Sequence, residues 1–168
     1  MLTNGAAAPF FITMIINTES PDQPEVRDML ARLDAYCASL YPSESNHLMD
    51  MASLMRGDVL FLVARGVDGA AVGCAALVRR DTEGEDEGYG EIKRMFVDET
   101  KRGLGTGRKL MEHIAMFAAM SGLRVLKLET GIHQPEAIAL YERFGFVRRG
   151  PFGDYQPDPL SVFMEKHL

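Results

Sequence analysis

The stretch KRGLGTGRKL (101–110) places three glycines at alternate positions, directly before an apolar segment with helical spacing. Glycine disfavours a helix by about 1 kcal/mol relative to alanine, so glycines at a helix start need a reason. A strand-to-helix turn or a tight packing contact would need only one or two of them. Gly103, Gly105 and Gly107 together favour a bare backbone that a ligand approaches closely.

The charges around the glycines indicate what that ligand carries. Amide groups at a helix N-terminus are unsatisfied and lie at the positive end of the helix dipole, so they bind phosphate. Arg102, Arg108 and Lys109 add positive charge beside the same backbone. We therefore predict a phosphate-bearing ligand at this helix start.

Two common phosphate-binding motifs do not fit the stretch. A Walker P-loop requires G-x-x-x-x-G-K-[ST], and no segment matches it. A dinucleotide site requires G-x-G-x-x-G close to the end of a strand. Here five residues separate Val97 from Gly103 and the spacing is G-x-G-x-G.

The rest of the chain alternates strand and helix patterns. Ser20 is a candidate cap for the first long helix, which Pro42 ends. A right-handed crossover around the glycine segment makes part of the sheet parallel. We predict a single α+β domain over 1–168, sandwich-like, with a mixed central sheet of about seven strands flanked by about four helices. The predicted strands are 10–16, 58–66, 70–80, 89–97, 123–130, 146–150 and 160–168; shorter helices are 43–55 and 134–145.

The composition excludes several classes of protein. The formal net charge is −6, which argues against nucleic acid as the main partner. The acidic run 81–87 is typical of a solvated hairpin loop rather than a calcium loop. Three of the four histidines lack metal-ligand spacing, so we expect no bound metal ion; these three are His113, His133 and His167.

Cysteine usage and hydropathy predict a cytoplasmic protein. Cys37 and Cys74 are the only cysteines and lie in apolar settings, which indicates a reducing compartment, with Cys74 in the core. No apolar run approaches 18 residues, so we expect no membrane association. The first 16 residues lack a basic segment and contain Pro9, so they predict a first strand rather than a signal peptide. We expect residues 1–9 to be flexible.

Two segments together resemble the GNAT superfamily of acyl-CoA-dependent N-acyltransferases. RGLGTG (102–107) matches that family's [QR]-x-x-G-x-[GA] motif, and its distance from Val97 agrees. HQPEAIALYERFGF (133–146) is similar to the family's N-x-x-A-x-x-L-Y-E-x-x-G-F segment, with Gln134 in place of asparagine. The motifs cover about residues 90–146, and the element order extends the resemblance over nearly the whole chain.

The resemblance implies a GNAT fold and acetyl-CoA as the co-substrate. In that family, amides after the motif's first residue hold the pyrophosphate, and the preceding strand binds the acyl and pantetheine groups through its main chain. That strand, the fourth of the fold, and the fifth strand splay apart to admit the thioester. The implied cofactor-binding residues are Met95, Phe96, Val97, Arg102, Gly103, Leu104, Gly105, Thr106, Gly107, Arg108, Gln134 and Tyr141.

Acyl transfer to an amine requires a base for the ammonium proton and an acid near the departing thiolate. The resemblance implies Tyr141 as the acid, although helical spacing alone would make it a packing residue. Glu129 and Glu91, near the end and the start of two strands, are the alternative bases, and either could instead be a solvated strand end. The chain shows no Ser/His/Asp or Cys/His arrangement, so direct transfer in a ternary complex is expected.

Four residues are candidates for binding the acceptor. His47 lies where the resemblance places an acceptor loop, although it could be an ordinary surface histidine. Phe152, Asp154 and Tyr155 belong to PFGDYQPDPLS (151–161), a link that could close the acceptor pocket. Asp154 would favour a cationic amine.

The sequence thus favours an N-acetyltransferase that acts on the primary amine of a small molecule, such as an amino acid or related metabolite. A protein N-terminal or lysine acetyltransferase is the first alternative. A non-catalytic acetyl-CoA-binding module is the second. The resemblance also leaves room for a homodimer.

Overall fold

The computed structural model describes residues 14–81 and 88–168. Residues 1–9, which were predicted to be flexible, lie outside the described residues. So do residues 82–87 of the acidic loop and residues 10–13 of the predicted strand 10–16. The structure begins that strand, β1, at Ile15 and ends it at Thr18.

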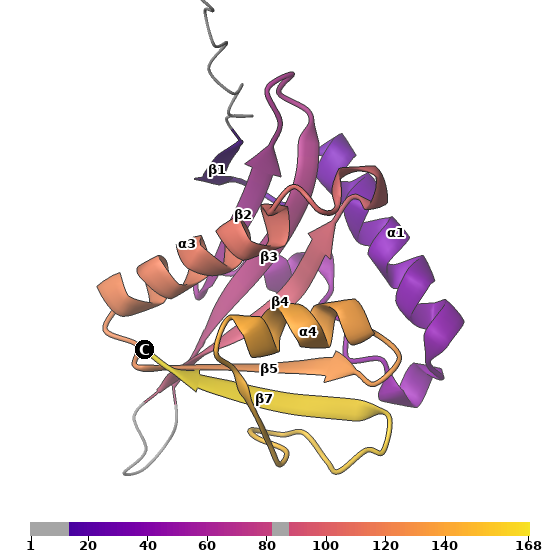
Figure 1. Cartoon of the computed structure of the whole chain (residues 1–168), viewed down its shortest axis with the longest axis vertical. Helices are drawn as coiled ribbons and strands as arrows, with labels where there is room; N and C mark the ends of the chain where they lie inside the picture. The colour runs from indigo at the N-terminus through magenta and orange to yellow at the C-terminus, as the bar shows by residue number, and fades with distance from the viewer. Residues whose placement is uncertain (1–13, 82–87) are drawn as a thin grey trace, which may run out of the picture.

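The elements form one mixed sheet of seven strands, as predicted, and the strands lie in the order β1-β2-β3-β4-β5-β7-β6 (Figure 1). Only the β4–β5 pair is parallel; the other five neighbouring pairs are antiparallel. The remaining strands are β2 (Val59–Arg65), β3 (Ala71–Arg80), β4 (Tyr89–Val97), β5 (Val125–Gly131), β6 (Val147–Arg149) and β7 (Ser161–His167). The helices are α1 (Pro24–Leu40), α2 (Met51–Leu54), α3 (Thr106–Met120) and α4 (Pro135–Arg143), with 3₁₀ turns at Ser43–Ser45 and Glu99–Lys101.

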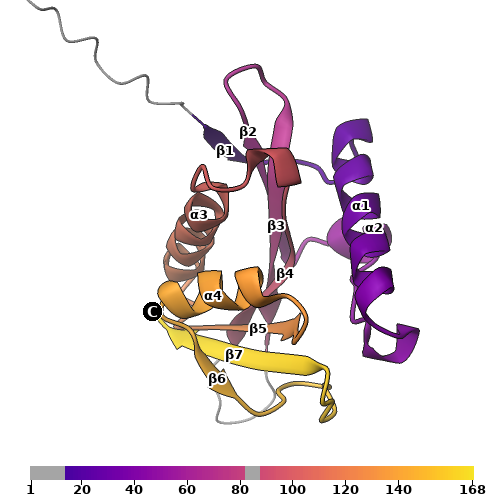
Figure 2. The same ribbon diagram turned by 45° about the vertical axis from the view of Figure 1, so that its right-hand side comes forward.

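The helices cover the sheet on both faces, with α3 and α4 on one side and α1 and α2 on the other (Figure 2). Each long helix is amphipathic, so burying its apolar stripe drives the packing. The α3 stripe enters the larger core cluster and consists of Leu110, Met111, Ile114 and Ala118. The α1 stripe enters the second cluster and consists of Val26, Met29, Leu30, Leu33 and Cys37.

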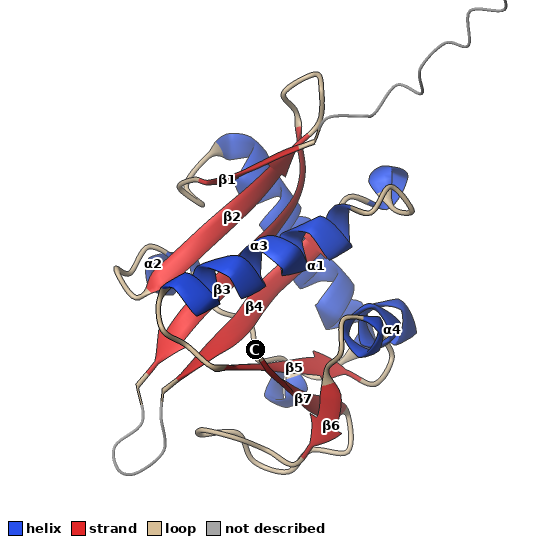
Figure 3. Ribbon diagram, turned by 60° about the vertical axis from the view of Figure 1, so that its left-hand side comes forward, coloured by secondary structure: helices blue, strands red, loops and turns tan. Residues whose placement is uncertain are grey.

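Strands β4 and β5 pair over only three residues and then diverge (Figure 3). Their register ends at Ile92 opposite Leu128, which leaves the carboxyl-terminal half of β4 without β5 as a neighbour. In the same half, the β3–β4 register shifts at a bulge, where Arg94 adopts a φ of 55°. This split confirms the splayed strands that the resemblance implied.

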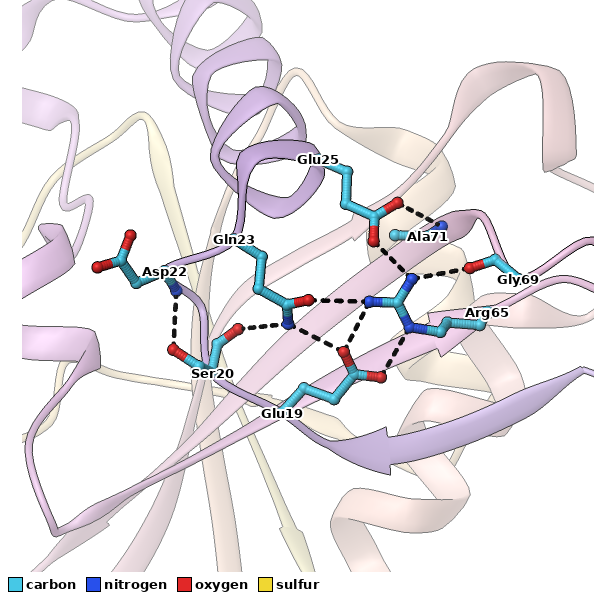
Figure 4. Close-up of polar contacts among 8 residues, drawn as sticks. All are labelled: Glu19, Ser20, Asp22, Gln23, Glu25, Arg65, Gly69 and Ala71. Carbon is cyan, nitrogen blue, oxygen red and sulfur yellow. Dashed lines mark hydrogen bonds and ion pairs between the residues drawn. The ribbon is translucent and has the colours of Figure 1, made fainter.

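A network of hydrogen bonds around Arg65 fixes the start of α1 against β2 (Figure 4). The guanidinium donates to both carboxylate oxygens of Glu19, at 2.8 and 2.7 Å, and to Gln23 and Glu25. It also donates to the Gly69 carbonyl in the β2–β3 turn. These bonds join residues 19–25 to residues 65–69, two segments that are about 40 positions apart in the sequence.

Two local predictions are wrong. The segment 43–55 is not one helix but a 3₁₀ turn, an extended stretch and α2, because Asp50 caps a new helix by accepting from the Ser53 amide at 2.8 Å. Ser20 does not cap α1, since the cap position is Gln23 and Ser20 Oγ instead accepts from the Asp22 amide. Proline at the first helical position sets the start of α1.

Candidate active site

A cavity of about 920 Å³ opens between α1, the end of β4, the glycine loop and α4. It collects nearly all the residues predicted to bind the co-substrate. Those that line it are Met95, Phe96, Val97, Arg102, Gly103, Gly105, Thr106, Gly107, Arg108 and Gln134. Leu104 is not among the lining residues and is 49% exposed.

The three glycines serve two different purposes. Gly103 and Gly105 adopt φ values of 80° and 79°, where L side chains are strained, and an added Cβ at either would meet nothing within 4 Å. Gly107 has an ordinary φ, but a Cβ there would lie 3.0 Å from Leu140 Cδ2 of α4. Two glycines therefore shape an open loop, and the third allows α3 and α4 to approach.

The loop and the first turn of α3 fit a phosphate group. The first amides of α3 have no partners within the helix, as at any helix start. The buried hydroxyl of Thr106 has no hydrogen-bond partner among the described residues. The lining contains the positive side chains of Arg102, Arg108 and Arg143 and the negative side chain of Glu136. Arg143 and the α1 residue Tyr36 were not predicted from the sequence.

An ion pair ties the glycine loop to α1. Arg32 of α1 donates to Asp98 at 2.8 Å, and Asp98 accepts from the Thr100 amide as the cap of the short turn before the loop. The Thr100 and Arg32 hydrogen bonds lower the pKa of Asp98 to about 2. The carboxylate therefore stays ionised and keeps this turn in place at neutral pH.

The β4 bulge is held from two sides. The Arg94 side chain is 5% exposed and forms an ion pair with Asp34 of α1. The buried Cys74 thiol lies 3.6 Å from the Arg94 carbonyl, and burial raises the pKa of Cys74 to about 12, as expected for a core cysteine. Because β5 has diverged, Met95, Phe96 and Val97 border the large cavity.

A second cavity of about 120 Å³ continues from the first. Leu33, Met95, Gln134, Ala137 and Leu140 line both of them. The smaller cavity brings together three predicted site residues from separate segments, which are His47, Glu129 and Tyr141. It occupies the gap between the diverging ends of β4 and β5, and the 43–50 segment forms one wall.

Tyr141 combines a packing role with a position at this gap. It is 5% exposed, and its ring lies 6.0 Å from that of Phe146, so the packing alternative holds in part. Its hydroxyl makes no hydrogen bond within the described parts of the chain. Burial raises the pKa of the Tyr141 phenol well above its usual value, which keeps it protonated.

The two candidate bases differ in their surroundings. Glu129 is half-buried, lines the smaller cavity and accepts from Ser161 Oγ at 2.7 Å. Burial raises its pKa, more than Ser161 and Lys93 lower it. Glu91 is 3% exposed, lines neither cavity and accepts from Arg80 at 2.8 Å and Tyr155 at 2.6 Å. Of the two carboxylates, only Glu129 therefore lines a cavity.

Gln134 turns back toward its own loop. Its side-chain oxygen accepts from the Gly131 amide at 3.2 Å, between β5 and α4. The side chain still lines both cavities. Where the family motif has asparagine, the glutamine oxygen is therefore occupied by the protein itself.

The predicted acceptor residues divide between the pocket and its support. His47 lines the smaller cavity, and its ring packs edge-on against Tyr155 at 5.2 Å. Phe152 is buried in an aromatic cluster with Tyr89 and Phe163. Asp154 is exposed on the same loop and lines neither cavity. The structure does not bring Phe152, Asp154 or Tyr155 to the wall of either cavity; Tyr155 instead supports the wall through its contacts with His47 and Lys93.

Sequence reasoning missed Lys93 and Tyr41. Lys93 Nζ donates to the His47 carbonyl at 2.8 Å and to Tyr155 Oη at 2.7 Å, and the side chain lines the smaller cavity. Tyr41 Oη accepts from the His133 amide at 3.0 Å, and an added Cβ at Gly131 would clash with it. The period of two along β4 could have revealed Lys93, because it shares a face with Glu91.

The described residues contain no group of three or more histidine, cysteine, aspartate or glutamate side chains that could hold a metal ion. Within residues 14–81 and 88–168, every helix is too short or too polar to cross a membrane.

Comparison with known proteins gives consistent matches. The model of the acetyltransferase (GNAT) family matches residues 24–146. An IAA acetyltransferase of Azospirillum brasilense is 54% identical over 153 residues, which are 91% of this chain and 97% of that protein. YsnE of Bacillus subtilis, described as an uncharacterized N-acetyltransferase, is 38% identical over 76% of this chain and 82% of its own length. A Klebsiella pneumoniae crystal structure, described as an acyl-CoA N-acyltransferase, has a TM-score of 0.78 and 41% identity and covers 92% of this chain and 97% of that one.

Proposed function

The chain belongs to the GNAT family of acetyltransferases, and on that premise we propose that it transfers an acetyl group from acetyl-CoA to the primary amine of a small molecule. One observation carries the proposal. The large cavity beside the glycine loop continues into a small polar pocket that holds Glu129 and Tyr141. A bound thioester and a bound amine would meet where the two cavities join.

Acetyl-CoA supplies an activated acyl group when it is bound. The amides of the first turn of α3, with Arg102 and Arg108, would hold its diphosphate. The main chain of Met95 and Val97, which β5 leaves uncovered, would align the acyl arm. These residues bind and orient the donor without forming a covalent bond to it.

Glu129 would remove the proton that an ammonium must lose before its nitrogen can attack. Its raised pKa, caused by burial, brings it closer to neutral pH and makes it a better base. Tyr141 would give its phenolic proton to the departing sulfur, and its unbonded hydroxyl is available for this step. As the amide forms, the nitrogen loses a second proton, which replaces through solvent the proton that Tyr141 gave to the sulfur. Glu129 releases the first proton to solvent, so the whole reaction releases one proton.

The size of the acceptor pocket favours a small molecule over a protein. The cavity has a volume of about 120 Å³, and the 43–50 segment forms one of its walls, so it offers little room for a polypeptide substrate. The named relatives are acetyltransferases, which favours an enzyme over a non-catalytic binding module. Both cysteines are free and buried, which supports the prediction of a reducing, cytoplasmic location. The homodimer stays a prediction.

The proposal is tested by incubating the full chain and acetyl-CoA with a metabolite extract and, separately, with a peptide library. Mass spectrometry of the products should show acetylated free amines with saturable kinetics. Turnover of peptides alone would reject the small-molecule proposal and leave the protein-acetylating alternative. Binding of coenzyme A without turnover in either mixture would indicate a binding module.

A further inference from the structure

The acceptor pocket contains a buried cation that the proposed reaction does not use. Lys93 lies on β4, on the same face as Glu91, and its side chain is 11% exposed. The β4–β5 pairing ends at Ile92 opposite Leu128, so Lys93 is the first residue of β4 beyond this pairing and Glu129 is the first residue of β5 beyond it. The paired neighbours Glu91 and Lys127 set this register, so Lys93 and Glu129 face the same cavity from opposite sides of the split.

The hydrogen bonds of Lys93 leave one donor over. An ammonium group has three N–H donors. Two of them bind the His47 carbonyl and Tyr155 Oη, and Glu91 Oε1 lies 3.6 Å from Nζ, an ion-pair contact slightly longer than a hydrogen bond. Among the described residues, Lys93 therefore has one N–H with no acceptor within 3.5 Å, and Lys93 lines the cavity.

The charge of Lys93 is also incompletely neutralised. Glu91 accepts hydrogen bonds from Arg80 and Tyr155 and forms ion pairs with both Arg80 and Lys93, so its single negative charge is shared between two cations. Burial lowers the pKa of the Lys93 ammonium, while the nearby carboxylates of Glu91 and Glu129 oppose that change. A buried charge that keeps an unused donor is costly, and an anionic ligand group would compensate for it.

We propose that Lys93 binds a carboxylate of the acceptor, so that the substrate is an amino acid whose amine faces Glu129 and whose carboxylate faces Lys93. This inference rests on the proposed small-molecule function and narrows it. Paired strands lie about 4.8 Å apart, and the split widens that spacing, so the two charges match the ends of a small zwitterion. Lys93 is then a specificity-determining residue rather than only a link between the His47 segment and the Tyr155 loop.

The test compares substrates that differ only in charge. A panel of free L-amino acids and the matching L-amino acid amides is assayed with acetyl-CoA by following thiol release. We expect kcat/KM to favour the acid over the amide by about 10- to 100-fold for the preferred side chain. Lys93→Met should bring this ratio close to one, mainly through KM for the acid. Lys93→Arg, which keeps the charge, should retain a preference for the acid.

Tyr155→Phe is the matched control, because it removes a hydrogen bond to Nζ but keeps the positive charge. It should lower turnover of acid and amide by similar factors. Equal use of acid and amide by the unmodified protein overturns the inference. So does an equal loss for both substrates in Lys93→Met. If Lys93→Met does not fold, as judged by its melting temperature, the ratio measured on the unmodified protein decides alone.

The inference and the proposed function fail in different ways. Acetylation of free amines without any preference for a carboxylate overturns only the Lys93 assignment. Acetylation of peptides alone, with no free acid or amide used, overturns the small-molecule function and the carboxylate site together.

Discussion

Two polar clusters in this molecule contain similar residues but differ in how fully their hydrogen bonds are made. At the start of α1, Arg65 donates five hydrogen bonds, to Glu19, Gln23, Glu25 and a carbonyl (Figure 4). A guanidinium has five N–H donors, so none is left over. In the acceptor pocket, Lys93 uses two donors of three.

The difference separates structural from functional polar groups. Where every donor and acceptor of a polar cluster is hydrogen-bonded, those bonds offset the free energy of removing the charges from water, and the cluster stabilises the fold. Where a buried donor has no acceptor, its desolvation penalty is not offset, and this is the condition expected where a ligand supplies the missing acceptor. Both clusters contain acids with shifted pKa values, but Arg65 lowers the pKa of Glu19, whereas burial raises that of Glu129.

The largest effect is expected for Glu129→Gln. Removing a general base lowers kcat/KM by about 10²- to 10⁴-fold, so we expect a loss of about 1,000-fold. In the unmodified enzyme, activity should fall on the acidic side as Glu129 takes up a proton, at a pH above the ordinary carboxyl pKa of 4.5. The pH profile of kcat/KM checks this.

Glu91→Gln provides the comparison, because Glu91 lines neither cavity. It should leave the acidic limb of the profile in place. An acidic limb that survives Glu129→Gln and vanishes in Glu91→Gln would reverse the two assignments.

Tyr141→Phe should produce the next largest effect. Loss of the proton donor is expected to lower kcat by about 100-fold, while the dissociation constant for acetyl-CoA changes little. Calorimetry and steady-state kinetics measure the two quantities. Tyr89→Phe removes a buried phenol outside both cavities and should leave kcat nearly unchanged. Unchanged turnover in Tyr141→Phe would show that Tyr141 is not the proton donor and has only a packing role.

Sequence patterns predicted the fold well because its elements are strongly patterned. The α3 stripe from Leu110 to Ala118 has helical spacing, and the structure buries it. Gly145 adopts a φ of 94° directly after the cap of α4, which is a common conformation for glycine at a helix end. Such local signals depend on residues close in the chain.

The acceptor pocket could be predicted only in part, since it depends on contacts between distant segments. Tyr155 lies 62 positions from Lys93 and 64 from Glu91, and no periodicity reveals those bonds. The wrong helix at 43–55 has the same origin, because the His47 carbonyl accepts from Lys93 instead of from a helix amide. Tertiary contacts override local propensity there.

A moderate effect is expected for Gly105→Ala in the glycine loop. A side chain at a φ of 79° costs about 1–2 kcal/mol, and relaxation of the loop would misplace the amides of α3. We expect the dissociation constant for coenzyme A to rise about tenfold, measured by calorimetry. Gly122→Ala is the matched control, since its φ of 75° imposes similar strain at the other end of α3. Equal losses of affinity in both variants would exclude a local role for the loop.

The smallest effect on catalysis is expected for Arg65→Met, which tests the satisfied cluster. It should leave kcat unchanged and lower the free energy of unfolding by about 1–3 kcal/mol near neutral pH, because Glu19 and Glu25 lose their charged partner. Glu25 is 44% exposed, so solvent screens its share and most of the loss falls on Glu19. Arg56→Met removes an exposed pair with Asp58 and should change stability by less than about 0.5 kcal/mol.

The pH dependence of that loss gives the sharper test. Arg65 holds the pKa of Glu19 below its ordinary value of 4.5, so the stabilisation is complete above that value. It disappears as the pH falls through the lowered pKa, where folded and unfolded chains both become protonated. The stability difference between the unmodified protein and Arg65→Met, measured by urea unfolding, should therefore be constant from pH 7 to about 5.5 and shrink below about pH 4. A difference that persists undiminished at low pH would mean that Arg65 stabilises α1 through packing and its bonds to Gln23 and the Gly69 carbonyl, and the contrast with the acceptor pocket would then lie in geometry rather than charge.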